Sequence, residues 1–123
     1  MNANAKQWVA ALRSGEFKQG TECLRSVDDN YCCLGVACEL FSKATGELEA
    51  EYSNFSQEYR YGDKAAILPA DVKDWLGLAD EEGSYGGTLE DHTLTGLNDI
   101  GKSFAEIADV IESEPPGLFV ETH

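Results

Sequence analysis

The sequence has 123 residues and a mass of 13.4 kDa, which is the size of one folded domain with a single core and excludes two. Hydrophobic residues make up 42% of the chain and charged residues 26%, a composition that excludes wholesale disorder. We therefore expect a single domain over residues 1–123, with a tail within 114–123 that is frayed or lightly docked.

The charge is strongly acidic and unevenly distributed. Nine basic and 23 acidic residues give a formal net charge of −14 at pH 7. Residues 1–43 are neutral overall, so the whole net charge belongs to residues 44–123. A surface this negative repels phosphate backbones and anionic lipid headgroups, which disfavours direct binding to nucleic acid or membranes. Acidic side chains keep a small protein soluble, but they also suit a face that meets a basic partner, and composition leaves both interpretations open.

The sequence shows no sign of targeting. Its first residues contain no basic segment followed by an apolar run, and no stretch reaches the roughly 18 apolar residues of a membrane span. We therefore expect a cytoplasmic protein. All four cysteines lie in the first third of the chain, and in a reducing cytoplasm they should be free thiols: Cys23, Cys32, Cys33 and Cys38.

The first third of the chain predicts two helices. Apolar residues at helical spacing indicate a helix from Asn4 to Arg13, which Gly15 ends. The segment 21–26 is compatible with a short strand, and the polar residues 28–30 are typical of a turn. Residues 31–41 are almost all apolar or small, which predicts a buried central helix over about 31–43, capped by Asp29 or Asn30.

The middle of the chain predicts a hairpin and a short helix. Aromatic residues among polar ones over 46–62 favour a small antiparallel hairpin. Over 68–77, Pro69 at the first helical position and Gly77 after the last one mark a helix. The acidic, glycine-rich segment 80–92 follows, and we expect it to be a mobile loop.

The last third predicts a helical turn and a final helix. Residues 94–99 predict a short helical turn, and Gly101 is the residue expected to terminate it. Ser103 and Glu106 form the pattern of a capping box, and the apolar spacing that follows indicates a helix that Pro115 and Pro116 end. Together the elements predict an α+β, mostly helical fold, with about four helices packed around the central helix and a small hairpin.

The cysteines do not match a zinc site, because structural zinc sites use two pairs of ligands and Cys32 and Cys33 are adjacent. Small buried side chains on the central helix are the preferred interpretation. The alternative is a Cys/His hydrolase with Cys32 or Cys33 as nucleophile, His92 as base and Asn98 or Asp99 as orienter. No oxyanion-hole residue can be recognised, so we expect no catalytic residue and no enzyme.

Two ligand motifs fail at their diagnostic positions. An EF-hand that begins at Asp80 has Tyr85 where glycine is needed and Asp91 where glutamate is needed. The segment 96–103 formally matches a phosphate-binding loop, but no hydrophobic strand precedes it, and Asp99 lies where a triphosphate would sit. We therefore expect no metal and no cofactor.

The remaining candidate site is electrostatic. Acidic residues gather on the predicted helix 68–77, directly after it, and along the outer side of the last helix. Such an array could imitate the phosphates of nucleic acid and occupy a basic groove on another protein. The candidate partner-binding residues are Asp71, Asp74, Asp80, Glu81, Glu82, Glu106, Asp109 and Glu112.

Three segments carry a family resemblance: WVAALRSGEFKQG (8–20), YCCLGVAC (31–38) and LNDIGKSFAEIAD (97–109). The chain resembles a family of small proteins found in bacteriophages and prophages. The resemblance implies an accessory protein made in the cytoplasm of a bacterial host, and it assigns no catalytic residue. It favours a non-enzymatic protein that binds a host protein, as an inhibitor or nucleic-acid mimic, through the acidic last two thirds.

One alternative is a protein that binds or sequesters a small ligand such as a nucleotide. That role needs a locally positive pocket, for which Arg13, Lys18 and Arg25 are the candidates. The hydrolase is the third alternative.

Overall fold

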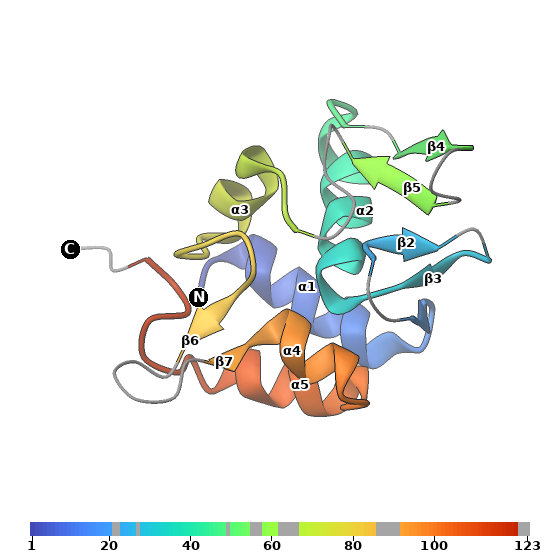
Figure 1. Cartoon of the computed structure of the whole chain (residues 1–123). Helices are drawn as coiled ribbons and strands as arrows, with labels where there is room; N and C mark the ends of the chain where they lie inside the picture. The colour runs from blue at the N-terminus through green and yellow to red at the C-terminus, as the bar shows by residue number, and fades with distance from the viewer. Residues whose placement is uncertain are drawn as a thin grey trace.

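The structure is a computed structural model that describes residues 1–20, 23–26, 28–48, 50–54, 58–61, 67–85 and 92–120. These residues form an α+β fold, as the sequence predicts (Figure 1). The described helices are α1 (Ala3–Ser14), α2 (Cys33–Thr45), α3 (Ala70–Leu76), α4 (Leu94–Asp99) and α5 (Phe104–Glu112). The described strands are β1 (Lys18–Gln19), β2 (Arg25–Ser26), β3 (Asn30–Tyr31), β4 (Ala50–Ser53), β5 (Glu58–Tyr61), β6 (Ser84–Tyr85) and β7 (His92–Thr93).

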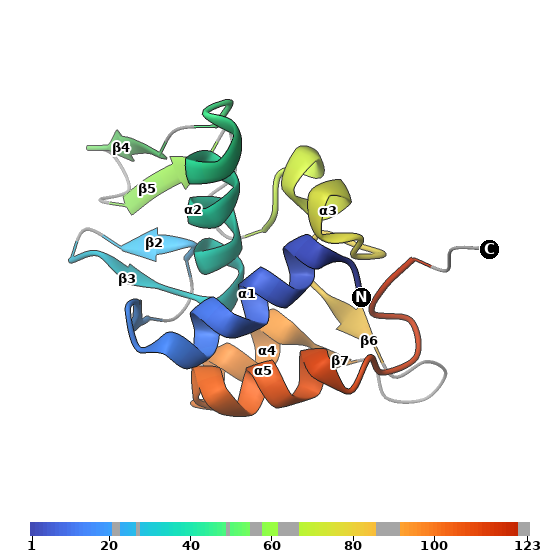
Figure 2. The same cartoon turned by 180° about the vertical axis from the view of Figure 1, so that it is seen from behind.

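Helix α1 confirms the first predicted helix. The Asn2 side chain accepts a hydrogen bond from the Ala5 amide at the start, and Gly15 ends the helix with a φ of 79°. Trp8 and Leu12 are buried on one face. Figure 2 shows α1 running between α2 and α5, and α1 contacts both of these helices.

Helix α2 is the buried helix predicted over about 31–43, but it begins at Cys33 and not at residue 31. The preceding residues Asn30 and Tyr31 pair with β1 and β2 as strand β3, so neither Asp29 nor Asn30 caps the helix. The cap is Cys32, whose Sγ accepts a hydrogen bond from the Gly35 amide at 3.4 Å. The helix contacts α1, α3 and α4.

The two residues that interrupt the apolar run of α2 have specific partners. Gly35 faces the Leu24 carbonyl, because a Cβ built on this glycine would lie 2.7 Å from the Leu24 carbonyl carbon and closer still to its oxygen. Glu39 accepts a hydrogen bond from the hydroxyl of the buried Tyr61 at 3.1 Å. Gly35 therefore allows a close approach of the helix to the chain before β2, and Glu39 satisfies a buried hydroxyl group.

Strands β4 and β5 confirm the predicted antiparallel hairpin, but they form the edge of a larger sheet. The strand order is β1-β3-β2-β5-β4, with β1 and β3 parallel and the other neighbours antiparallel. Arg25 on β2 lies over the Tyr59 ring on β5, 4.1 Å from its centroid. Thr21 and Glu22, part of the predicted strand 21–26, lie outside the described residues.

Helix α3 starts one residue later than the sequence predicts, because Pro69 takes the N-cap position and Ala70 the first helical one. Within the segment expected to be a mobile loop, β6 and β7 form a two-stranded antiparallel ladder, and residues 86–91 lie outside the described part. The segment expected to be a helical turn is the complete helix α4, so the described residues contain five helices. Helix α5 has the predicted capping box of Ser103 and Glu106.

The described part of the tail, residues 114–120, is docked on the fold. Leu118 is buried, Phe119 forms a bridge with Leu78, and the Val120 amide donates to the Gly77 carbonyl at 2.9 Å. Burial of Leu118 against the core and these backbone pairs hold the segment on the fold. Residues 121–123 lie outside the described part.

Candidate functional site

The thiols on and next to α2 belong to the hydrophobic core. Cys32, Cys33 and Cys38 are buried, and the Cys33 Sγ donates to the Leu94 carbonyl at 3.5 Å. Burial raises the pKa of the Cys32 thiol to about 11 and also raises the pKa values of Cys33 and Cys38. A nucleophilic cysteine needs the opposite, a lowered pKa and access to substrate, so the geometry opposes the hydrolase alternative.

We expect these three thiols to be protected from modification in the native protein. At neutral pH, iodoacetamide should label Cys23, which is only half-buried, well before Cys32 or Cys33. All four thiols should react at similar rates in denaturant, which serves as the control. Peptide mapping by mass spectrometry measures the label at each position. Rapid native labelling of Cys32 or Cys33 would contradict the buried placement.

The first half of the segment that resembles a phosphate-binding loop is helical. Residues 96–99 belong to α4, and the Thr93 hydroxyl accepts a hydrogen bond from the Gly96 amide at 2.9 Å. At the start of α5, the Ser103 amide donates to the Glu106 carboxylate at 3.3 Å, and the Glu106 amide donates to the Ser103 hydroxyl. These amides already donate to side chains of the protein, so they are not available as hydrogen-bond donors to a phosphate group.

Asn98 is the buried polar residue that holds this region together. Its Oδ1 accepts from the Cys33 amide at 3.2 Å and from the Gln19 side chain at 3.1 Å. Its Nδ2 donates to the Gly20 carbonyl at 2.6 Å. Asn98 therefore joins α4, the start of α2 and the end of β1, which is a structural role. In the sequence, the signal for this structural role is the polar residue Asn98 among the apolar residues of α4.

The first group of predicted acidic residues lies on α3 and in the segment after it. Asp71, Asp74, Glu81 and Glu82 are exposed, and we call them the α3 patch. The Glu81 carbonyl accepts from the Leu68 amide at 2.9 Å, which places this segment beside the start of α3. Lys73 lies 3.6 Å from Asp74 and is the cation that pairs with this patch among the described residues.

Asp80 has a structural role in the same segment. Its Oδ1 accepts from the Glu82 and Ser84 amides, both at 2.9 Å. Partial burial raises the pKa of the Asp80 carboxyl, but the hydrogen bonds from Ser84 and Glu82 outweigh this effect and leave the pKa below its ordinary value. Asp80 therefore shapes the turn, and its Oδ1 is occupied by the chain itself.

The second group lies on α5, and we call Glu106, Asp109 and Glu112 the α5 patch. All three side chains are exposed. Arg13 of α1 donates to Asp109 at 2.6 Å and also to Glu112, and Lys102 lies 3.8 Å from Glu106. The α5 patch is therefore partly neutralised, whereas most of the α3 patch has no cationic partner in the described part of the chain.

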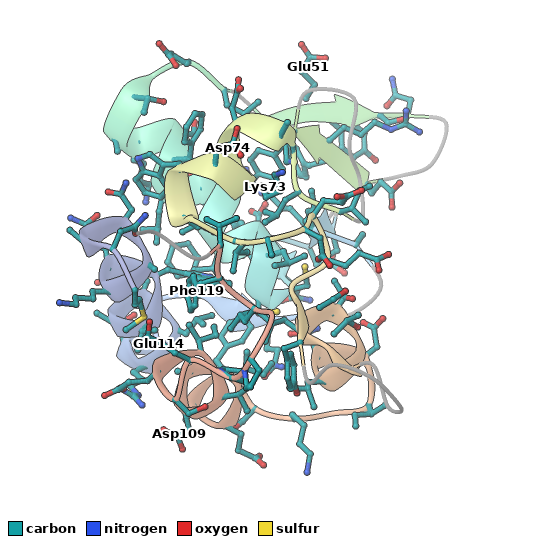
Figure 3. All side chains as sticks on the ribbon, turned by 90° about the vertical axis from the view of Figure 1, so that its left-hand side faces the viewer. Glu51, Lys73, Asp74, Asp109, Glu114 and Phe119 are labelled. Carbon is teal, nitrogen blue, oxygen red and sulfur yellow. The ribbon has the colours of Figure 1, made fainter. Side chains whose placement is uncertain are left out.

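The structure does not bring the two patches together. In Figure 3, Asp74 on α3 and Asp109 on α5 lie toward opposite ends of the view, with Phe119 and Glu114 between them. Glu114, a residue outside the predicted set, accepts a hydrogen bond from the Met1 amino group at 2.5 Å. The acidic residues therefore form two separate surfaces on the molecule.

Cavities lie on both sides of α5. A cavity of about 560 Å³ between α1 and α5 is lined in part by Lys6, Arg13 and Glu112. A second, of about 310 Å³, lies between α4 and α5, and the residues that line it are Leu97, Lys102, Glu106, Asp109 and Val110. Of the three cations predicted for a ligand pocket, Arg13 pairs with the α5 patch and Arg25 pairs with Asp29 at 2.8 Å. They lie on separate elements, as does Lys18 on β1.

Among the described residues, no three His, Cys, Asp or Glu side chains are placed to hold a metal ion. No described helix has the length and apolar character needed to cross a membrane. These features define a small α+β domain with a strongly acidic surface. The chain belongs to the family described as a domain of unknown function, DUF8296, whose model matches residues 1–115. Neither a curated protein nor a solved structure matches the chain.

Proposed function

We propose that this protein is a non-enzymatic accessory protein of a bacteriophage or prophage. It acts in the host cytoplasm by binding a basic host protein through its acidic surface, as an inhibitor or as a mimic of nucleic acid. The phage context comes from the resemblance of the three motifs, and the binding mode comes from the charge. Enzymatic alternatives receive no support from the buried thiols of α2.

The observation that carries the proposal is the excess of exposed carboxylates that have no cationic partner among the described residues. In the α3 patch, Asp71, Glu81 and Glu82 form no ion pair with a described residue. Unpaired surface charges of one sign raise the rate of encounter with an oppositely charged protein, and they repel nucleic acid. The surface therefore fits a basic protein partner.

The ligand-binding alternative rests on the cavity between α1 and α5. Its volume suits a small molecule, and Lys6 lies at its lining without an ion-pair partner among the described residues. However, Arg13 is already paired with Asp109 and Glu112, which leaves little net positive charge for a nucleotide. A ligand would raise the melting temperature of the purified protein, so a thermal shift with nucleotides tests this alternative.

The proposal is tested by affinity capture from bacterial lysate at low and high salt, with mass spectrometry of the retained proteins. We expect a basic protein that is retained at low salt and released at high salt, because exposed charge pairs are screened. Three variants carry three neutralised acids each: Asp71→Asn, Glu81→Gln and Glu82→Gln for the α3 patch; Glu106→Gln, Asp109→Asn and Glu112→Gln for the α5 patch; and Glu16→Gln, Glu47→Gln and Glu51→Gln as control.

We expect at least one patch variant to lose most of the captured protein, while the control keeps it. The control residues are exposed and lie outside both patches, so it removes the same charge from other surfaces. Equal losses in all three variants would show that only net charge matters and would contradict a defined binding surface. The absence of a salt-released basic protein would contradict the proposal itself.

A further inference from the structure

The groove between α4 and α5 combines an apolar floor with an acidic rim. Leu97 of α4 and Val110 of α5 are half-buried and line the groove, and Glu106 and Asp109 line it from α5. The groove has a volume of about 310 Å³. This is enough for one or two side chains of a partner, and it lies at the lower end of the volumes typical of small-molecule sites.

An exposed hydrophobic residue extends the apolar part of this surface. Ile100 is 73% exposed, which is the largest exposed fraction among the large hydrophobic side chains that the structure describes. Ile100 is the C-cap residue of α4 and follows Leu97, which lines the groove, by three residues, a spacing that brings the two side chains to the same side of the helix end. Burial of Ile100 against a partner would remove apolar surface from water, which favours association.

The charges around the groove select its occupant. The Glu106 side chain is 58% exposed and the Asp109 side chain 73% exposed, so a partner can reach both carboxylates. Lys102 also lines the groove and pairs with Glu106, and Arg13 pairs with Asp109, so the charged lining residues carry a net charge of only −1. These ion pairs are exposed and therefore weak, and an incoming cation can share or replace them. A second copy of the chain would bring a net charge of −14 against the same charge, which opposes self-association.

We infer that the α4–α5 groove docks a short basic amphipathic segment of a partner protein. An aliphatic side chain of that segment packs on Leu97, Ile100 and Val110, while flanking lysine or arginine residues pair with Glu106 and Asp109. The inference rests on the proposed function, since it specifies which part of the acidic surface contacts the basic partner and adds an apolar anchor.

The test uses two fluorescein-labelled synthetic peptides and measures binding by fluorescence anisotropy at low and high salt. One peptide alternates leucine and lysine pairs, and the other has serine in place of every leucine at the same charge. We expect the leucine peptide to bind about tenfold more tightly, because only it supplies the apolar anchor.

Matched variants locate the contact. Ile100→Ser should weaken binding of the leucine peptide about fivefold to tenfold, whereas Val120→Ser, which removes an exposed apolar side chain elsewhere, should leave it unchanged. Glu106→Gln keeps the capping box, since glutamine also serves at that position, and should weaken binding about twofold to fivefold. Glu112→Gln removes one charge from the same helix outside the groove and should have less effect.

Equal affinity for the two peptides, or equal effects of Ile100→Ser and Val120→Ser, would overturn the groove inference. Salt-released capture of a basic host protein that is insensitive to Ile100→Ser would likewise overturn it, while leaving the proposed function in place. Failure of the capture experiment itself, with the leucine peptide still bound in an Ile100-dependent way, would overturn the proposed function and support the groove as a basic-peptide site.

Discussion

Replacement of Gly35 by alanine should destabilise the protein by roughly 3–4 kcal/mol, although alanine is the better helix former by about 1 kcal/mol. The added Cβ would lie 2.7 Å from the Leu24 carbonyl carbon, so α2 and the chain before β2 must separate. That movement also strains the hydrogen bond from the Cys32 amide to the Leu24 carbonyl, which is 3.3 Å long.

Urea unfolding followed by the fluorescence of Trp8 and Trp75 measures the change in the free energy of unfolding. Gly46→Ala is the matched control, because Gly46 has a φ of 69° and no atom within 4 Å of an added Cβ. That substitution should cost only about 1 kcal/mol, the strain of a left-handed alanine. If Gly35→Ala lowered the free energy of unfolding no more than Gly46→Ala does, the result would contradict the close approach of α2 to Leu24.

Asn98→Ala should also lower the free energy of unfolding strongly, by roughly 3 kcal/mol. Asn98 is fully buried, and both Oδ1 and Nδ2 of its side chain form hydrogen bonds. The substitution leaves the Cys33 amide and the Gly20 carbonyl without their partner. The same unfolding experiment measures the loss.

Asn4→Ala is its control, since the Asn4 amide donates one hydrogen bond to the Trp75 carbonyl at 3.0 Å and Asn2 donates to the same carbonyl. Its cost should stay below about 1 kcal/mol because that carbonyl keeps a partner. Similar losses for Asn98→Ala and Asn4→Ala would remove Asn98 from its role as the junction of α4, α2 and β1.

Helices were predictable from the sequence where a local signal marks their ends. The capping box of Ser103 and Glu106 fixes the start of α5, and Gly15 and Gly77 end α1 and α3 through local backbone geometry. These signals act within one turn of helix, so they can be recognised in the sequence without knowledge of the rest of the fold.

Strand β2 (Arg25–Ser26) lies within the predicted strand 21–26, but strands β1 and β3 were not predictable, for the opposite reason. Strands β1 and β3 are too short to show an alternating pattern, and they exist because Lys18 and Asn30 meet across the sheet. Because Asn30 and Tyr31 form β3, α2 begins only at Cys33. This explains why the N-cap that the sequence predicts at Asp29 or Asn30 is wrong.

The candidate site divides in the same way. The sequence identified the acidic residues themselves, but not which cations would pair with them. Arg13 and Asp109 are 96 residues apart in the chain, so no local sequence pattern indicates that they form an ion pair. The groove went unpredicted because it forms only where α4 packs beside α5, which leaves Leu97 and Val110 half-buried between them.

The pairing of α1 with α5 has a consequence for how the chain folds. The first helix packs against the last, so much of the apolar face of α1 has no cover until residues 104–112 have left the ribosome. Contacts between such distant segments require closure of a long loop, which slows folding relative to a bundle of sequential neighbours. During synthesis the surface of α1 that packs against α5 therefore stays uncovered, and the core is completed only after translation of α5.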